Sequence, residues 1–127
     1  MLLDTHALLW VLHGDSRLSK EARQRYEQAG TIYYSAVNLW EIGIKLGLRR
    51  DDFRLDMNWW RDIPQSMRIQ GVECLSIEPE DCREVGLLPL HHRDPFDRML
   101  VVQALRVKCP ILSKDTALDA YQVARIW

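Results

Sequence analysis

The chain has 127 residues, a length that fits one compact domain with a core large enough to fold without disulfides. Hydrophobic residues make up 47% of it and charged residues 28%, the ordinary balance of a globular protein. Its 17 basic and 18 acidic residues give a net charge of -1, which excludes the basic coat of a general nucleic-acid binder. If the protein handles nucleic acid, it does so at a local site where metal ions offset its carboxylates.

The cysteines and the N-terminus bear on the cellular compartment. Cys74, Cys82 and Cys109 are odd in number and match no zinc spacing, so we expect buried or half-buried free thiols in a reducing cytosol. Asp4 and His6 interrupt the apolar N-terminal run, which has no basic leader and is not expected to be a secretory signal. No apolar stretch reaches about 18 residues, so we expect no membrane span and a cytoplasmic protein.

Strands and helices are predicted to alternate in the first half of the chain. Ser19 and Ser35 are suitable N-caps, and Gly14, Gly30 and Gly47 are suitable helix ends. The predicted strands cover residues 1–4 and 31–34, and the predicted helices cover residues 5–13, 20–28 and 36–46.

The same alternation continues in the second half, after a less certain stretch at 48–70. There Asn58 would start a helix, and Pro64 lies near enough to kink it. Pro79 opens one helix, and Asp94 caps another that begins at Pro95. The predicted strands cover 72–77, 109–113 and 123–127, and the predicted helices cover 79–87, 95–107 and a turn at 116–121. Because strands alternate with helices, we predict an α/β fold, a central parallel sheet with helices on both faces, as one domain over residues 1–127.

Four carboxylates occur where such a fold places its chemistry. Asp4 follows the first strand and Asp115 lies just beyond the fourth, while Glu41 and Asp97 lie on helices that leave the same edge. Ligands of open α/β sheets bind outside the carboxyl ends of the strands. We therefore expect the four side chains to lie together.

Carboxylates brought together repel one another, and a hard divalent cation such as Mg²⁺ would offset that repulsion. With a phosphate substrate, the cation neutralises phosphoryl oxygens and lowers the pKa of a bound water. The pattern therefore favours metal-dependent hydrolysis and needs no Ser/His/Asp triad.

Each acid also has an ordinary structural explanation. Asp97 would favour the helix dipole, Glu41 would pair with Lys45 four residues on, and Asp115 would cap a helix. Asp4 follows a buried strand and is the acid that structure alone explains least. Taken alone, the pattern leaves both explanations open.

Three blocks of sequence resemble PIN-domain ribonucleases and, among them, VapC-type toxins. They are LLDTHALLW at 2–10, SAVNLWEIGIK at 35–45 and HHRDPFDRMLVVQA at 91–104, with a weaker block, ILSKDTALDAY, at 111–121. The resemblance covers essentially the whole chain, and it implies a PIN-like three-layer sandwich.

The resemblance also implies a role for particular residues. One acid from each block would be catalytic and bind the metal: Asp4, Glu41, Asp97 and Asp115. Thr5 and Ser113 would place hydroxyls at the metal site, and Asp94 would cap the helix that aims Asp97 or support the site directly. Residues His91, His92, Arg93 and Arg98 would flank the site and meet RNA phosphates, or else form a solvated surface.

The implied function is that of a toxin in a type II toxin–antitoxin system. The toxin would be an endoribonuclease dependent on Mg²⁺ or Mn²⁺, would form a homodimer, and would be inhibited by a cognate antitoxin. The antitoxin groove would involve the 36–46 helix and the 48–70 region, with Trp59 and Trp60 either as anchors or as ordinary core residues.

Two other functions remain open at this point. One is a metal-dependent phosphohydrolase of small phosphate esters that uses Asp4 as nucleophile, although His6 stands where its usual second acid would be. The other is a non-catalytic binding module that retains the fold, against which the presence of all four acids counts.

Overall fold

A parallel sheet of five strands, in the order β3-β2-β1-β4-β5, forms the centre of the computed structural model, which describes residues 1–48 and 55–127. The strands are β1 (Leu2–Leu3), β2 (Tyr33–Ser35), β3 (Glu73–Leu75), β4 (Ile111–Leu112) and β5 (Arg125–Ile126). They are joined by α1 (Thr5–His13), α2 (Lys20–Gln28), α3 (Ala36–Gly47), α4 (Trp59–Ile69), α5 (Pro79–Leu87), α6 (Pro95–Arg106) and the short 3₁₀ helix η1 (Thr116–Ala120). The chain first adds strands on one side of β1 and then, from β4 onward, on the other. The strand order therefore reverses between β1 and β4.

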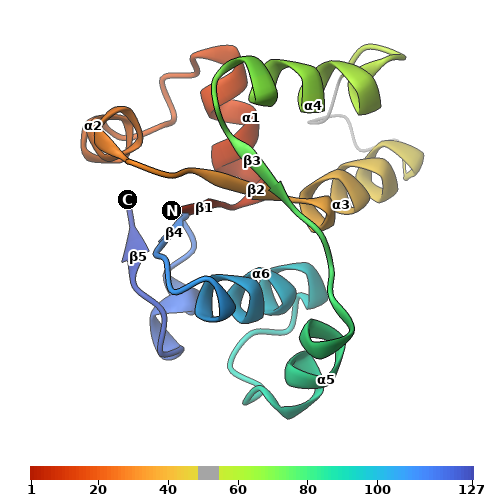
Figure 1. Ribbon diagram of the computed structural model, residues 1–127, viewed down its shortest axis with the longest axis vertical. Coiled ribbons are helices and arrows are strands. Elements are labelled where there is room, and N and C mark those ends of the chain that lie inside the picture. Colours follow the sequence, from red (N-terminus) through yellow and green to blue (C-terminus); the bar gives the residue numbers. More distant parts are fainter. Residues whose placement is uncertain (49–54) are drawn as a thin grey trace.

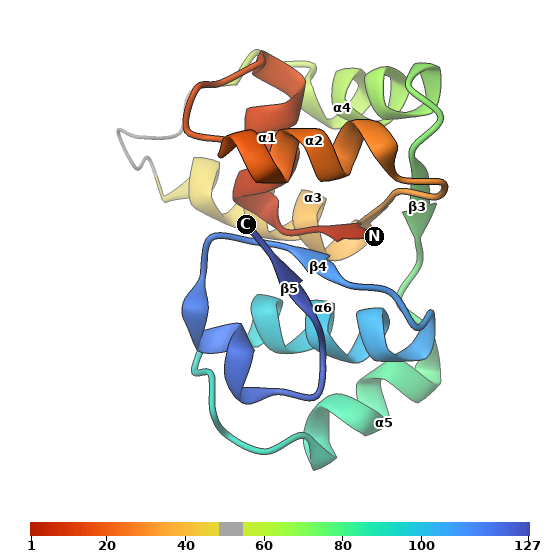
Figure 2. The ribbon, with the colours of Figure 1, turned by 90° about the vertical axis from the view of Figure 1, so that its left-hand side faces the viewer.

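The helices form layers on the two faces of the sheet. Helices α1, α2 and α4 cover one face, and α5 and α6 cover the other (Figure 1). The view turned by 90° shows the same division, with β4 and β5 between the two layers (Figure 2). Helix α3 packs against both α1 and α6. The predicted three-layer α/β sandwich is confirmed.

Successive residues of the central strands pack into opposite layers. Leu3 and Leu112 belong to the core beneath α1, whereas Leu2 and Ile111 belong to the core beneath α6. All four side chains are fully buried. Such burial stabilises the fold by roughly 1.5–3 kcal/mol per side chain. Because each of these short strands is packed on both faces, its position is fixed, and so is the position of the residue that follows it.

Local signals set the helix ends much as the sequence predicts. Asp4 caps α1 by accepting from the Ala7 amide at 2.6 Å, and Gly14 ends that helix in the left-handed conformation at φ 60°. Ser35 and Asn38 form a capping box at the start of α3.

Several predicted bounds differ from the observed ones. Gly47 is the last residue of α3 rather than its stop, and the strands are shorter than predicted because ladder pairing covers only two or three residues of each. Helix α4 continues through Pro64. Residues 49–54 of the less certain stretch lie outside the described residues.

The three cysteines are free, but their expected burial is wrong for two of them. Cys74 is exposed on the edge strand β3 and Cys82 is exposed on α5, while Cys109 is half-buried. Within residues 1–48 and 55–127, no helix is both long and apolar enough to cross a membrane.

Candidate functional site

A cavity of about 580 Å³ opens at the carboxyl ends of β1 and β4. This is the point where the strand order reverses, the usual ligand position in an open α/β sheet. Its lining is mostly polar and consists of Asp4, Thr5, His6, Trp10, Arg17, Glu41, Lys45, His92, Asp94, Asp97, Lys114 and Asp115. The fold thus brings together the four acids that the sequence singled out, along with Thr5 and Asp94.

Asp4 is held rigidly at the base of the cavity. It directly follows β1, is 5% exposed, and accepts a hydrogen bond from the Ala7 amide at the start of α1. Burial raises the pKa of this carboxyl, against the lowering effect of hydrogen bonds from Ala7 and Ser113, and nearby Glu41 raises it further. The fully buried Ser113 also accepts from the Asp115 amide at 3.0 Å, so its hydroxyl links two of the predicted acids.

A short chain of hydrogen bonds orients Glu41 in the cavity. The Asn38 amide donates to the Thr5 hydroxyl at 3.0 Å, and that hydroxyl donates to Glu41 Oε2 at 2.5 Å. The other oxygen, Oε1, pairs with Lys45 Nζ at 2.5 Å. The pairing of Glu41 with Lys45 is therefore real, but it is no alternative to a site role, because Glu41 is buried in the acidic cavity.

Asp97 projects into the cavity from the first turn of α6. Asp94 caps that helix through the Phe96 amide at 2.9 Å, as predicted, and so fixes the direction of the turn. The pKa of Asp97 is raised to about 7, first by burial and then by the negative charge of Asp94, with Glu41 and Asp4 adding to it and His92 opposing it. Burial, together with the neighbouring acids, therefore favours the protonated form of this carboxyl in the metal-free protein.

Asp115 lies opposite Asp97, and His92 lies between them. Asp115 Oδ1 accepts from the Ala117 amide at 2.8 Å and so caps η1, while its Oδ2 lies 2.9 Å from His92 Nε2. The same nitrogen is 3.5 Å from Asp97 Oδ2. One ligand atom from each of these three side chains lies within 4.8 Å of the others, a spacing that would suit a metal ion.

The charges in this trio shift one another. Burial lowers the pKa of His92, but the hydrogen bond with Asp115 and the charges of Asp97 and Asp115 outweigh it, so the net direction is upward. Burial would raise the pKa of Asp115, but the hydrogen bonds from His92 and Ala117 outweigh it and lower the pKa. His92 is thus a member of the site, although the sequence assigned it only to the flank.

Among the predicted flanking residues, Arg98 is the clear correction. It is 8% exposed, and its guanidinium donates to the carbonyls of Pro89, Val85 and Leu88. Those bonds anchor the connection between α5 and α6, so Arg98 is not available to RNA. Arg93 and His91 are exposed, and the His91 ring contacts Tyr121 with the ring centroids 5.2 Å apart.

Other lining residues were missed because their direction depends on packing. Trp10 lies on α1 and Arg17 lies in the loop after it. The Arg17 guanidinium is 5.3 Å from the centroid of the Trp10 ring. The His6 ring also contacts that indole in a tilted arrangement, with the ring centroids 5.6 Å apart, and Lys114 adds a cation next to Asp115. No spacing rule in the sequence groups these residues, since the sheet alone brings them to one edge.

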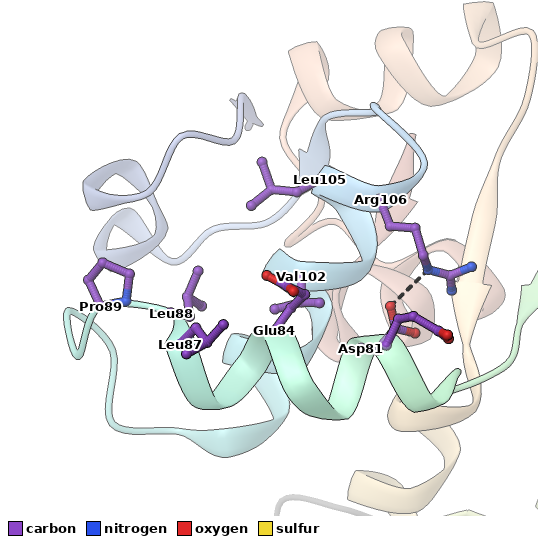
Figure 3. Close-up of a pocket in the computed structure, with 9 residues that line it drawn as sticks. Asp81, Glu84, Leu87, Leu88, Pro89, Val102, Leu105 and Arg106 are labelled. Carbon is purple, nitrogen blue, oxygen red and sulfur yellow. Dashed lines mark ion pairs between the residues drawn. The ribbon is translucent and has the colours of Figure 1, made fainter.

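A second cavity of about 350 Å³ lies between α5 and α6 (Figure 3). Its apolar lining includes Leu87, Leu88 and Leu105, and its Asp81 is already paired with Arg106 at 2.8 Å. The side chains that bear hydrolytic chemistry therefore converge at the sheet edge, not here.

Fold and site together define a three-layer α/β protein with an acidic pocket at the carboxyl edge of its parallel sheet. A family model described as the PIN domain matches residues 1–124, and the chain belongs to that family. The family membership predicted from the sequence is confirmed.

A solved structure extends the likeness to the whole fold. The chain is similar to one in the crystal structure of VapBC2 from Rickettsia felis bound to a DNA fragment from its promoter, with a TM-score of 0.67. The match covers 98% of this chain and 95% of that chain at 10% sequence identity, so it speaks for the fold. No curated protein gives a significant match.

Proposed function

We propose that the protein is a metal-dependent endoribonuclease that acts as the toxin of a type II toxin–antitoxin system. The observation that carries this proposal is the convergence of Asp4, Glu41, Asp97 and Asp115 on one cavity at the carboxyl edge of the sheet. Membership of the PIN domain family and the likeness to a chain of VapBC2 support the same function.

The donor set fits a hard divalent cation. The cavity offers carboxylate oxygens, the ligands that Mg²⁺ and Mn²⁺ prefer. Burial raises the pKa values of Asp4 and Asp97, and neighbouring acids raise them further, so a bound cation would stabilise the charged carboxylates. When bound, such a cation would neutralise phosphoryl oxygens and lower the pKa of a water that attacks phosphorus.

The chain's own residues would bind and orient the parts of this reaction. The four acids hold the cation, with Thr5 and Ser113 fixing the carboxylates of Glu41 and Asp4 respectively. Basic side chains at the cavity would bind the phosphates of an RNA strand, and the exposed Arg93 would extend that contact. These cavity residues are Arg17, Lys45 and Lys114.

An apolar stripe beside the cavity would bind the antitoxin. Trp40, Ile44 and Leu48 are spaced four residues apart on α3 and its end, and they are 57%, 40% and 63% exposed. Trp60 on α4 is also exposed. Trp59 is half-buried and packs so close to Gly43 of α3 that a Cβ added there would contact it, so Trp59 is a packing residue. We propose that an apolar antitoxin segment covers this stripe, while one of its arginines pairs with the acids in the cavity.

Homodimerisation is a further part of the proposal, and sedimentation or light scattering of the purified protein would test it. A dimer would place two cavities in one particle. A monomer over the whole accessible concentration range would remove this part and leave the nuclease itself unaffected.

The test of the nuclease is cleavage of a panel of single-stranded and structured RNAs. Activity should be lost in excess chelator, return with Mg²⁺ or Mn²⁺, and return poorly with Ca²⁺, whose larger size and looser geometry position a water less well. Strong cleavage in chelator would point instead to acid–base catalysis by His91 or His92. Hydrolysis of small phosphate esters without RNA cleavage would favour a phosphohydrolase, and neither activity would favour a binding module.

A further inference from the structure

We propose that His92 is a positioning residue that holds Asp97 and Asp115 at their working separation through its Nε2–H group, and that it is not a metal ligand. The inference rests on the proposed metal site, and it assigns a task to a side chain that lies among the ligand candidates. By proximity alone, His92 would be counted as a third ligand with Asp97 and Asp115.

The hydrogen bonds of the imidazole decide between these two tasks. The backbone amide of Asp94 donates to His92 Nδ1 at 3.0 Å, so Nδ1 must present a lone pair. In the neutral ring the hydrogen is then on Nε2. A charged ring would carry hydrogen on both nitrogens and would lose the bond from the Asp94 amide, but its Nε2 would still be a donor. Nε2 is therefore a donor in either state and has no lone pair to offer a cation.

The Nε2–H group hydrogen-bonds to one of the two carboxylates and lies close to the other. Nε2 is 2.9 Å from Asp115 Oδ2 and 3.5 Å from Asp97 Oδ2. Asp97 lies in the first turn of α6 and Asp115 is the N-cap of η1, so His92 links two separate elements across the cavity. Each carboxylate oxygen has a second lone pair, which remains available to a cation.

The ring is rigid enough to act as a spacer. Its side chain is 13% exposed, and the His92 backbone amide donates to the Tyr121 hydroxyl at 2.8 Å. That hydroxyl donates in turn to the Pro89 carbonyl at 3.0 Å. The backbone and the Nδ1 atom are thus both fixed, and the position of Nε2 follows from them.

Two matched substitutions separate a donor from a ligand. In His92→Gln the amide nitrogen can take the place of Nε2, whereas in His92→Asn it can reach only the place of Nδ1. Loss of a hydrogen-bond partner of a metal-binding side chain typically lowers metal affinity about 10–100-fold. We expect His92→Asn to weaken Mn²⁺ binding by that order, and His92→Gln to bind Mn²⁺ within about threefold of the parent. Calorimetry with the purified, metal-free full chain gives both affinities without any activity assay.

Pulsed electron paramagnetic resonance of the Mn²⁺-loaded parent adds a direct readout. The expected spectrum has no ¹⁴N coupling from a coordinated imidazole. A coupling that disappears in His92→Gln would overturn the proposal, as would equal affinities of the two variants, whether both are normal or both weakened.

A measurement on the parent alone guards against misfolding of the variants. Long-range ¹H–¹⁵N correlation spectra of the metal-free protein should show a hydrogen on Nε2 of His92, and a ring with hydrogen on Nδ1 alone would overturn the proposal. A parent that binds no Mn²⁺ would overturn both this inference and the proposed metal site. A parent that binds Mn²⁺ as described but cleaves no RNA would overturn the proposed function alone.

Discussion

Three of the aspartates that line the cavity also cap a helix. Asp4, Asp94 and Asp115 accept hydrogen bonds from backbone amides in the first turns of α1, α6 and η1. Asparagine is as good an N-cap as aspartate, but it carries no charge. Replacing aspartate by asparagine therefore separates the charge from the cap.

Asp4→Asn and Asp97→Asn should each abolish RNA cleavage while the fold survives. The exchange is nearly isosteric, and it removes a charge that the cation requires. Because both carboxyls have raised pKa values, the metal-free variants should be as stable as the parent or more stable, by on the order of 1 kcal/mol. Cleavage assays and urea unfolding in chelator measure the two effects, with the exposed Asp62→Asn on α4 as the matched control. An Asp97→Asn protein that cleaves at the parent rate would remove Asp97 from the site.

The raised pKa of Asp97 also predicts how stability depends on pH. The folded-state pKa of about 7 lies above the ordinary 3.8, so folding favours the protonated form. The contribution of this group is full below pH 3.8 and is lost as the pH rises through about 7. The parent should therefore lose stability relative to Asp97→Asn between about pH 4 and pH 8 in chelator. Groups with lowered pKa, such as Asp115, have the opposite slope, but they are common to both proteins. A difference in unfolding free energy that stays flat over this range would contradict the account.

At the scale of elements, α3 joins the layers to the site. Its Val37 packs into the core beneath α6, and its Ile42 packs into the core beneath α1. Glu41, between them in sequence, enters the cavity. The exposed stripe of Trp40, Ile44 and Leu48 lies on the same helix, so the helix that supplies one acid also presents the proposed antitoxin surface.

Two glycines make an element-scale test of stability. A Cβ at Gly43 in α3 would lie 3.6 Å from Trp59, which is ordinary contact, so Gly43→Ala should stabilise by about 0.5–1 kcal/mol through helix propensity. Gly14 has φ +60° at the end of α1, so Gly14→Ala should destabilise by about 1 kcal/mol or more although its side chain meets open space. Urea unfolding at constant pH measures both. A destabilised Gly43→Ala would mean that α3 and α4 pack more tightly there than the structure shows.

At the scale of the whole molecule, the cavity is open and its control would come from a partner. Its polar lining includes exposed and half-exposed side chains such as His6 and Asp97, so a strand of RNA has access. The apolar stripe on α3 lies beside it and offers a partner both an anchoring surface and an acidic pocket.

Expression of the parent chain should therefore arrest bacterial growth, and co-expression of an adjacent small gene should restore it. Asp4→Asn, which lacks the charge that the cation needs, should be harmless by itself. Leu48→Glu, at a 63% exposed position away from the acids, should remain toxic but be rescued less well, since it puts a charge into the stripe. Growth curves with matched soluble expression measure each case. If the parent is harmless at high soluble levels while it cleaves RNA in vitro, the toxin role fails and the nuclease stands.

The sequence by itself determined the elements and the acids. Helix spans such as 5–13, 20–28 and 79–87 agree with α1, α2 and α5, because caps and apolar periodicity act between residues that are near in sequence. The four acids could be predicted in the same way, because strand ends and family motifs are also short stretches of sequence. What such signals do not fix is the direction of a side chain that packs against a distant segment.

Only the tertiary structure decided how the named residues are used. Arg98 turns away to bond carbonyls between α5 and α6, whereas His92 turns in to join Asp97 and Asp115. The spacing of His92 and Asp115 along the chain, 23 residues, says nothing of the 2.9 Å between them. That distance depends on the pairing of β1 with β4 and on the packing of α6 against the sheet, which are long-range contacts that no local pattern records.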